Sequence, residues 1–344
     1  MAIHNKSHHN SGLMQLNKMN KDSIKHKSSL DFTIPERTNC VLLNKDCLEL
    51  LKSIPDESVQ LILIDPPYNL DLAEWDTFNN YISWASKWIE ESYRVLSKSG
   101  SMVIFGGTQF QGEKSGDLIE IIHYLRHHTK FRLVNTVVWY YKNGMSAHRY
   151  FANRHEEAIW LTKTDKYYFD LDSVRIPYGE KELQEALRDK RLIPENVMKG
   201  KNPTNVWEIG RLNGNSLERV GHPTQKPLEI IRRFVKALSY PDSIVLDFFA
   251  GSGTTGRVCI EEKRNCIMCD TDKQSDMFFA KHIENMKKTE MNQPFIENDS
   301  LRSFFNGIKN RGTKEYIHQL QLNFEVPALT IPTSSYQRVA NSAL

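Results

Sequence analysis

The sequence lacks the features of several other classes of protein. No apolar run in the 344-residue chain is long enough to span a bilayer, and the polar residues 1–27 contain no apolar segment typical of a signal peptide. The five cysteines, at positions 40, 47, 259, 266 and 269, form no disulfide-like framework, and the Cys266-x-x-Cys269 pair has no second pair that would complete a zinc site. We therefore expect a cytoplasmic protein with buried thiols, no bound metal and no membrane partner.

A strong charge of one sign is also absent. The chain has 45 Lys and Arg residues and 42 Asp and Glu residues, which give a formal net charge of +3. A nucleic acid would therefore have to be bound by a local basic patch and not by the charge of the whole chain.

Apolar periodicity divides the chain into a central region and two polar ends. Residues 1–37 form a polar tail that carries Lys and His, and we expect this tail to be disordered. Residues 38–289 alternate short apolar runs with amphipathic stretches, which is typical of one α/β domain. Residues 290–344 turn polar and lose this periodicity, which predicts a peripheral extension.

The central region predicts a mostly parallel sheet with helices on both faces. We expect strands near residues 41–44, 59–64, 102–105, 133–139, 158–161 and 266–269. We expect helices near residues 48–53, 81–96, 118–126 and 229–238. On the helix at 81–96, the amphipathic pattern indicates that the core is formed by Trp84, Trp88, Ile89 and Val95.

The tetrapeptide Asp65-Pro66-Pro67-Tyr68 follows a strand-like apolar run and combines a carboxylate, a stiffened backbone and an aromatic ring. Two successive prolines fix φ and remove backbone N–H donors, so this strand end offers hydrogen-bond acceptors. An exocyclic amine of adenine or cytosine is a donor that needs such acceptors, and Tyr68 could stack on the base. The alternative for so short a motif is a proline-stiffened turn without chemistry.

A second motif, Asp247-Phe248-Phe249-Ala250-Gly251-Ser252-Gly253-Thr254, joins a buried strand to a helix that begins near its end. Its glycines allow a close approach of the backbone to a ligand, and the helix N-terminus offers unpaired N–H groups. The spacing matches neither the dinucleotide fingerprint nor a P-loop, and Asp247 would repel a phosphate but could pair with an ammonium group. Asp270 ends the next strand, where it can accept both hydroxyls of a ribose. Together these features predict S-adenosylmethionine as the cofactor.

With Asp65-Pro66-Pro67-Tyr68-Asn69 placed before the glycine turn, the chain resembles the beta-class amino-group DNA methyltransferases of restriction-modification systems. His222-Pro223-Thr224-Gln225-Lys226-Pro227 and Asn153-Arg154-His155-Glu156-Glu157 are further matches, and the similarity covers about residues 44–279. The resemblance implies the S-adenosylmethionine-dependent methyltransferase fold, Rossmann-like, with a circularly permuted order of motifs. One departure is Met268, which stands where many relatives have glycine. Segments 101–107, 143–147 and 205–227 are similar to the RsrI adenine methyltransferase, whose target is GAATTC.

The resemblance also implies roles for individual residues. Asp65 and the Pro66 carbonyl would accept the amine hydrogens of a flipped-out adenine, with Pro67 and Tyr68 completing the catalytic set. Lys226 and Thr224 would lie near the carboxylate of the cofactor. Asp46 would accept from the adenine amine of the cofactor, although it could equally cap the helix that follows. The full cofactor-binding set is Asp46, Cys47, His222, Thr224, Lys226, Asp247, Phe248, Phe249, Ala250, Gly251, Ser252, Gly253, Thr254 and Asp270.

Segment 177–220 does not continue the alternation of strands and helices, and we interpret it as an inserted target-recognition region. Lysines can neutralise phosphates, while Arg and Asn side chains can reach base edges in the major groove. A charge run of this kind is otherwise a solvated face. The candidate DNA contacts are Lys181, Arg188, Lys190, Arg191, Lys199, Lys201, Asn202, Asn205, Arg211, Asn213, Asn215 and Arg219.

We therefore predict methylation of adenine N6 in double-stranded DNA, within GAATTC, a site that a cognate restriction endonuclease would share. Both a monomer and a homodimer remain open. One alternative is a cytosine-N4 enzyme, whose motif more often begins with Ser than with the Asp65 found here. Another is an RNA methyltransferase, and a third is a non-catalytic DNA-binding protein, against which the intact Asp65, Tyr68, Gly251 and Gly253 argue. No cysteine follows a proline, so the nucleophile of a cytosine-C5 enzyme is missing.

Overall fold

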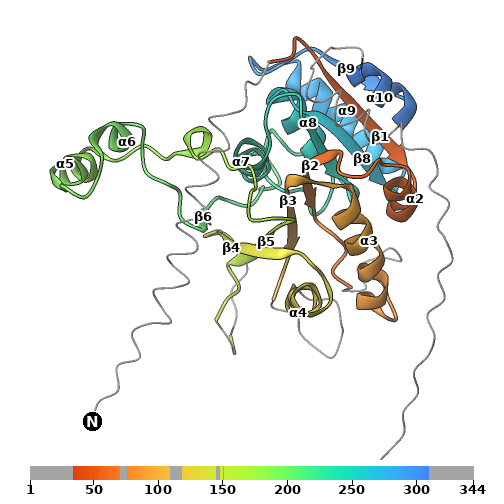
Figure 1. The fold of residues 1–344 in the computed structure, drawn as a ribbon, viewed down its shortest axis with the longest axis horizontal. Coiled ribbons are helices and arrows are strands. Elements are labelled where there is room, and N and C mark those ends of the chain that lie inside the picture. The colour runs from red at the N-terminus through yellow and green to blue at the C-terminus, as the bar shows by residue number, and fades with distance from the viewer. Residues whose placement is uncertain (1–33, 70–75, 109–117, 145–147, 150, 310–344) are drawn as a thin grey trace, which may run out of the picture.

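The computed structural model describes residues 34–69, 76–108, 118–144, 148–149 and 151–309, and its fold is shown in Figure 1. Nearly all of the predicted N-terminal tail and residues 310–344 of the predicted extension lie outside these residues. None of the helices in the described ranges is long and apolar enough to cross a membrane.

A nine-stranded sheet forms the centre of the described residues, in the order β6-β4-β5-β3-β2-β7-β8-β1-β9. Neighbouring strands are parallel, except that β5 runs antiparallel to both β3 and β4. The predicted mostly parallel sheet is thus confirmed. The strands are β1 (Thr38–Asn44), β2 (Val59–Ile64), β3 (Leu96–Gly106), β4 (Arg132–Tyr140), β5 (His155–Thr162), β6 (Val206–Glu208), β7 (Ile244–Asp247), β8 (Asn265–Asp270) and β9 (Phe295–Asn298).

Helices cover both faces of the sheet, because side chains along each buried strand alternate between two apolar cores. In β2, Ile62 and Ile64 face one core, and Leu61 and Leu63 face the other. The first core is closed by α2 (Cys47–Lys52), α3 (Tyr81–Val95), α4 (Leu118–His128) and α10 (Leu301–Lys309). The second is closed by α7 (Leu228–Leu238), α8 (Thr254–Glu261) and α9 (Gln274–Met286).

Core predictions for α3 and for the cysteines are largely confirmed. Trp88, Ile89 and Val95 are buried, and all five cysteines are free and buried. Trp84 is only partly buried and lines a cavity, so its interpretation as a core residue was incomplete. Met268 on β8 packs directly against Gly256 of α8. A β-carbon at position 256 would collide with the methionine side chain.

Four acidic residues follow four adjacent parallel strands at one edge of the sheet. The strands β2, β7, β8 and β1 lie side by side, and each is parallel to the next. Asp65 follows β2, Asp247 and Asp270 end β7 and β8, and Asp46 follows β1. Because neighbouring strands are about 4.8 Å apart, this row of carboxylates spans about 14 Å. In open α/β sheets, ligands bind beyond this end of the strands.

The prediction that the chain becomes peripheral from residue 290 is wrong for residues 295–309. Strand β9 pairs in parallel with β1, and α10 buries Phe304 and Phe305 against the first core. Ser300 accepts a hydrogen bond from the Ser303 amide (3.3 Å) at the start of this helix. The sequence signal is one short strand and one amphipathic helix, which a search for long periodic runs passes over. The domain therefore continues to at least Lys309.

Segment 177–220 divides into an arm and a part of the domain body. Helices α5 (Glu180–Arg188) and α6 (Pro194–Met198) form the arm, which projects away from the sheet (Figure 1). A bridge between Ile176 and Lys201 closes its base. After the arm, β6 pairs with β4 and buries Trp207 against Phe234 of α7. The residues from 206 onward thus contribute a strand and core side chains to the domain body.

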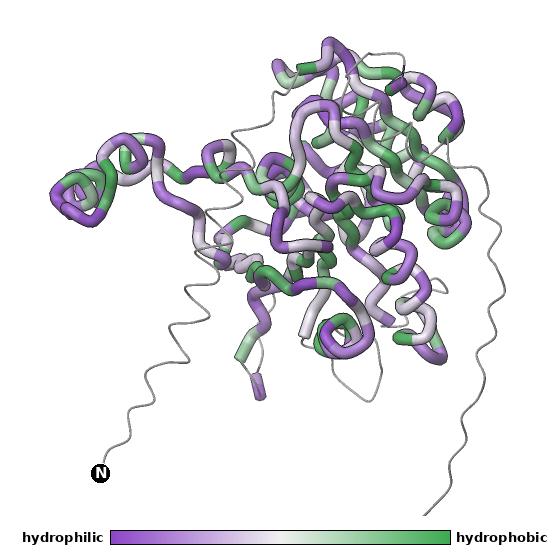
Figure 2. The backbone as a smooth tube through the Cα atoms, viewed as in Figure 1, coloured by the Kyte–Doolittle hydropathy of each residue, from purple (hydrophilic) through white to green (hydrophobic). Residues whose placement is uncertain are grey.

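The arm differs from the body in what it exposes. Figure 2 shows hydrophobic residues running through the sheet and its covering helices, whereas hydrophobic and hydrophilic residues are mixed in the arm. No residue of α5 is buried, and the arm exposes Leu187, Leu192, Ile193 and Met198.

Candidate active site

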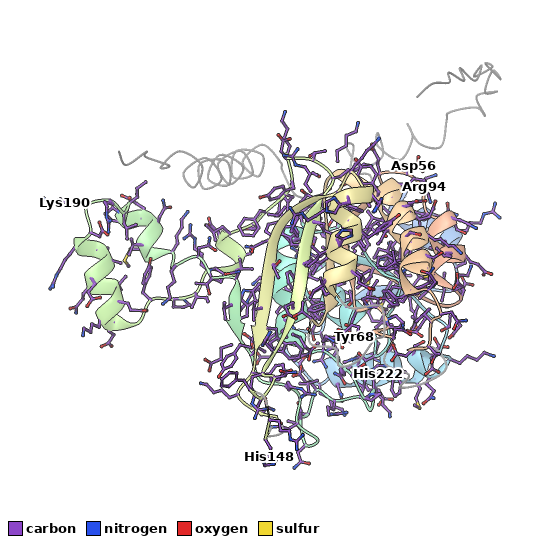
Figure 3. All side chains as sticks on the ribbon, turned by 90° about the horizontal axis from the view of Figure 1, so that it is seen from below. Asp56, Tyr68, Arg94, His148, Lys190 and His222 are labelled. Carbon is purple, nitrogen blue, oxygen red and sulfur yellow. The ribbon has the colours of Figure 1, made fainter. Side chains whose placement is uncertain are left out.

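A cavity of about 700 Å³ opens at the edge of the sheet where the four acidic residues gather. This volume is typical of a small-molecule site. Every residue of the predicted catalytic and cofactor sets lines it, with the exception of Gly253. Figure 3 shows Tyr68 and His222 close together at this edge, while Lys190 marks the distant arm.

Gly251 and Gly253 shape the turn between β7 and α8. Both have positive φ, 48° and 77°, a conformation that side chains disfavour. A β-carbon at Gly253 would lie 2.8 Å from the Phe279 ring, so this glycine is needed for packing behind the turn and not for contact with the cavity. A β-carbon at Gly251 would lie 3.2 Å from the His222 ring, on the cavity side. The turn thus brings bare backbone to the cavity.

Asp247 is a buried carboxylate at the start of this turn. It accepts hydrogen bonds from the Thr255 hydroxyl (2.6 Å) and the Phe249 amide (3.2 Å). Burial raises the pKa of Asp247 from 3.8 to about 7, and these hydrogen bonds oppose the shift only in part. Among the described residues no cationic side chain forms an ion pair with it. A bound cation would therefore stabilise its ionised form.

Asp270 and Asp46 have local hydrogen bonds as well as positions on the cavity wall. Asp270 accepts from the Gly251 amide (2.7 Å), which ties the glycine turn to the end of β8. Asp46 accepts from the Leu48 amide (2.8 Å) and caps α2, as the alternative interpretation of this residue proposed. Each carboxylate lines the cavity and can still accept a further donor there. Burial raises the pKa of Cys47 to about 12, so its thiol stays protonated.

At the other end of the cavity, Asp65 is engaged on both of its oxygens. The Tyr68 hydroxyl donates to Oδ1 (2.6 Å), and the Lys226 ammonium donates to Oδ2 (2.6 Å). Burial, with Asp65 and Glu156 adding to it, raises the pKa of Tyr68 well above its usual value, so Tyr68 donates as a neutral hydroxyl. The sequence predicted Lys226 near a cofactor carboxylate, and the structure places it against Asp65 of the predicted catalytic set.

Lys226 bridges two carboxylates. Its Nζ lies 2.6 Å from Asp65 and 3.3 Å from Oε2 of Glu156. Burial alone would lower the pKa of Lys226, but the two carboxylates more than offset burial and raise it, so the ammonium stays charged. The Nζ also lies 5.5 Å from the Phe105 ring centroid and 5.8 Å from that of Tyr68. Glu156 was part of a family match in the sequence but was not predicted as a site residue.

An aromatic wall lies between the two ends of the cavity. Phe78 and Trp84 pack with ring centroids 4.3 Å apart, and the Trp84 ring centroid lies 5.7 Å from that of Phe249 in the glycine turn. The Tyr81 hydroxyl donates to the Pro67 carbonyl (2.8 Å), which fixes the second proline of the motif. The sequence signal for this wall was the aromatic content of α3. That signal does not distinguish aromatic residues of a core from aromatic residues that line a ligand site.

The segment from His222 to Pro227 forms a third wall. Gln225 is buried, accepts from the Val220 amide (2.9 Å) and donates to the Glu218 carbonyl (2.8 Å), so it braces the loop. His222 is half-buried, and burial lowers its pKa. Thr224 is exposed at the rim, with its hydroxyl 3.4 Å from Nδ1 of His222. This loop therefore presents Lys226 inward and Thr224 at the rim.

Two loops meet at the mouth of the cavity. Asn143 accepts from the Arg211 amide (3.3 Å) and donates to the Asn213 side chain (3.0 Å). The Arg211 guanidinium lies 5.1 Å from the Tyr141 ring centroid and lines the cavity. The loops after β4 and β6 thus combine one arginine and two asparagines beside the opening.

A mostly parallel α/β sheet, with the Asp65-Pro66-Pro67-Tyr68 motif and a glycine turn on adjacent strands, fits the methyltransferase type of fold. The DNA methylase family model matches residues 59–281, and the chain belongs to this family. The Type II methyltransferase M.HpaI of Haemophilus parainfluenzae is 33% identical over 266 residues, which cover 76% of each chain. M.BglII of Bacillus subtilis is 32% identical, covering 74% of this chain and 71% of its own. The DNA adenine methyltransferase YhdJ of Escherichia coli (strain K12) is 36% identical, covering 66% and 76%.

Solved structures support the fold. The cytosine-N4-specific PvuII DNA methyltransferase superposes with a TM-score of 0.55 at 20% identity, covering 81% of this chain and 95% of its own. A putative DNA modification methylase from Thermus thermophilus, TTHA0409, complexed with S-adenosyl-L-methionine, gives 0.51 at 18% identity, covering 76% and 100%. At these identities the likeness concerns the fold alone.

Proposed function

We propose that the protein transfers a methyl group from S-adenosylmethionine to N6 of a flipped-out adenine in double-stranded DNA. One observation carries this proposal: Asp65 and the glycine turn follow the adjacent parallel strands β2 and β7 and open on one cavity. An amine held at Asp65 would therefore lie next to a cofactor held at the turn. Membership of the DNA methylase family supports the same reaction.

The residues at the turn fit this cofactor, which supplies a methyl group on a sulfonium centre. Asp247 is a buried carboxylate whose ionised form a cation would stabilise, and an amino acid end supplies an ammonium group. Asp270 and Asp46 follow on the next two strands and offer acceptors to ribose hydroxyls and to an adenine amine. The row of about 14 Å suits an elongated nucleoside cofactor that lies across the strand ends.

At the acceptor end, the protein orients the amine. Asp65 and the Pro66 carbonyl would each accept one N6 hydrogen, while the nitrogen lone pair points toward the methyl group. The Pro67 carbonyl is engaged by Tyr81, so it does not compete for the amine. The N6–carbon bond forms as the sulfur–carbon bond breaks, and Asp65 or water takes the proton that the methylated amine releases. Alignment of two bound reactants can contribute about 7 to 11 kcal/mol, so no covalent intermediate is needed.

Adenine is favoured over cytosine N4 for two reasons. The acceptor motif begins with Asp65 and not with Ser, and a relative named a DNA adenine methyltransferase is 36% identical. The PvuII enzyme is named cytosine-N4-specific, but at 20% identity it speaks only for the fold. The similarity of segment 205–227 to the RsrI enzyme makes GAATTC the first site to test.

For DNA contact, the structure favours the mouth of the cavity over the arm. Three of the predicted arm contacts form ion pairs within the protein: Arg191 with Asp189, Lys199 with Asp172 and Lys201 with Glu182. Arg211 and Asn213 instead lie beside the opening through which a flipped base would enter. We therefore assign base contacts to Arg211 and the asparagines around it.

Methyl transfer from labelled S-adenosylmethionine tests the proposed function. The substrates are GAATTC duplexes, hemimethylated duplexes and duplexes with the site scrambled, followed by nucleoside analysis. Label in N6-methyladenine that requires the intact site supports the reaction, the base and the target together. Label in N4-methylcytosine would overturn the base, and transfer to scrambled duplexes would overturn the target. Transfer to RNA alone, or cofactor binding without any transfer, would overturn the function.

A matched pair of arginine variants tests the assignment of DNA contacts. Arg211→Ala should lower kcat/KM on the target about 10- to 100-fold, because a base-reading side chain discriminates by about 1–3 kcal/mol. Arg191→Ala on the arm should change kcat/KM less than about threefold, because exposed ion pairs contribute little. The opposite order of effects would place the DNA contacts on the arm.

A further inference from the structure

In the arrangement that the structure shows, the amine of a target base would share Asp65 with two donors that are already bound there. Its Oδ1 is engaged by Tyr68 and its Oδ2 by Lys226, both at 2.6 Å. The buried ammonium also reduces the negative charge that Asp65 can offer to a donor. Asp65 would therefore be a stronger acceptor for a target amine if one of the two donors moved away.

Lys226 has a second carboxylate within reach. Glu156, on β5, lies 3.3 Å from the same Nζ, and its side chain is 23% exposed at the cavity wall. The ammonium has three protons, so a small movement would exchange a shared pair for a pair with Glu156 alone. Without Glu156, a withdrawing Lys226 would become a buried charge without a carboxylate, which is strongly unfavourable.

We infer that Glu156 is a positioning residue, which holds the Lys226 ammonium while Asp65 accepts the amine of the target base. This inference rests on the proposed function, because it concerns the acceptor step of that reaction. Glu156 touches neither the base nor the cofactor in this scheme, and it acts only through Lys226. The pair Lys226–Glu156 thus exchanges with the pair Lys226–Asp65 in each catalytic cycle.

The test compares methyl transfer by wild type, Glu156→Gln, Glu156→Asp, Lys226→Met and the Glu156→Gln/Lys226→Met double variant, on the duplex that the wild type methylates. Glu156→Gln should lower kcat about 10- to 100-fold, because misplaced reacting groups cost about this much. The KM for DNA and the affinity for S-adenosylmethionine should change less than about twofold. Glu156→Asp should retain more activity than Glu156→Gln, since it keeps a carboxylate.

Two further measurements separate positioning from a structural role. In the Lys226→Met background, Glu156→Gln should change kcat less than about twofold, because the residue through which it acts is gone. A duplex with 2-aminopurine at the target position reports base flipping by fluorescence. Because 2-aminopurine has no 6-amino group, its flipping does not require Asp65 as acceptor, and Glu156→Gln should leave the signal unchanged. Glu208→Gln, at an exposed pair with Lys142, is the control.

Each contrary result has a defined meaning. Glu156→Gln with wild-type kcat would overturn the inference alone, as would an equal loss in the Lys226→Met background. Loss of the 2-aminopurine signal together with kcat would also overturn it, because Glu156 would then serve to admit the base. A wild type that transfers no methyl group to DNA would overturn the proposed function, and this inference with it.

Discussion

Asp65 and Asp247 follow adjacent parallel strands at the two ends of one cavity, but their surroundings differ in charge. Asp65 is paired with a buried ammonium and a tyrosine hydroxyl. Among the residues that the structure describes, Asp247 accepts from one hydroxyl and one amide, and burial raises its pKa to about 7. The same residue type is thus prepared for two tasks by its neighbours. One carboxylate already pairs with a cation of the protein, and the other lacks such a partner among the described residues.

The largest effect is expected at the acceptor end. Asp65→Asn should lower methyl transfer at least about 1000-fold, because the amide offers a neutral acceptor in place of the carboxylate. Cofactor affinity should remain within a few fold, since the glycine turn is unchanged. Single-turnover transfer and equilibrium binding of labelled cofactor measure the two quantities. Asp56→Asn, at an exposed pair with Arg94, is the control. Equal losses of cofactor binding and methyl transfer would show that Asp65 also contributes to cofactor binding, and would contradict the separate roles of the two ends.

The second effect concerns cofactor binding at Asp247. Asp247→Asn should weaken S-adenosylmethionine binding about 100-fold at pH 8, because the ammonium loses its charged partner. The difference should shrink below pH 6, since the wild-type carboxylate is then mostly protonated. Calorimetric titration at pH 5.5, 7 and 8 measures this dependence. A wild-type affinity that does not change with pH would contradict the raised pKa.

The third effect is on the stability of the cofactor-free protein. Asp247 has a folded pKa of about 7, above the usual value of 3.8, so the folded state binds the extra proton between these values. Stability contributed by the protonated form is therefore present at low pH and is lost as pH rises through 7. Asp247→Asn should remove this loss and raise the free energy of unfolding at pH 8 by up to about 4 kcal/mol relative to wild type. Urea unfolding at several pH values gives the free energy of unfolding of both proteins. If Asp247 were not responsible, this free energy would change with pH equally in wild type and Asp247→Asn.

The smallest effect tests the rigidity of the cofactor turn. Gly253→Ala should destabilise the protein by about 1–2 kcal/mol, because a left-handed residue would acquire a side chain against Phe279. Gly214→Ala is the matched control, since a β-carbon there meets nothing within 4 Å. Thermal unfolding of the two variants gives the comparison. Similar midpoints would show that the turn can relax.

The sequence predicted the framework of the site better than its electrostatics. The acceptor motif, the glycine turn and Asp270 were found because each follows an apolar run, and strand ends in a parallel sheet gather at one edge. Glu156 was not assigned a role, because nothing local shows that β5 lies beside β3 and carries it to Lys226. Likewise, Lys226 was predicted beside the cofactor because its charge is visible in the sequence but its partner is not.

The ends of the domain show the same limit. The helix α10 and the strand β9 are short, and their signals are weaker than those of the long core strands. Burial against β1 stabilises them, and that contact joins residues far apart in the chain. Within segment 177–220, the sequence did not predict β6, because its pairing with β4 joins residues far apart in the chain.

The sequence by itself determined the α/β class and the order of the Asp65 motif and the glycine turn, because these depend on local patterns of a few residues. Only the tertiary structure decided that Asp65 forms an ion pair with Lys226, whereas Asp247 has no cationic partner among the described residues. It also placed Lys226 between two carboxylates and separated the arm from the mouth of the cavity. The physical reason is that burial and ion pairing depend on distances between strands that are remote in sequence.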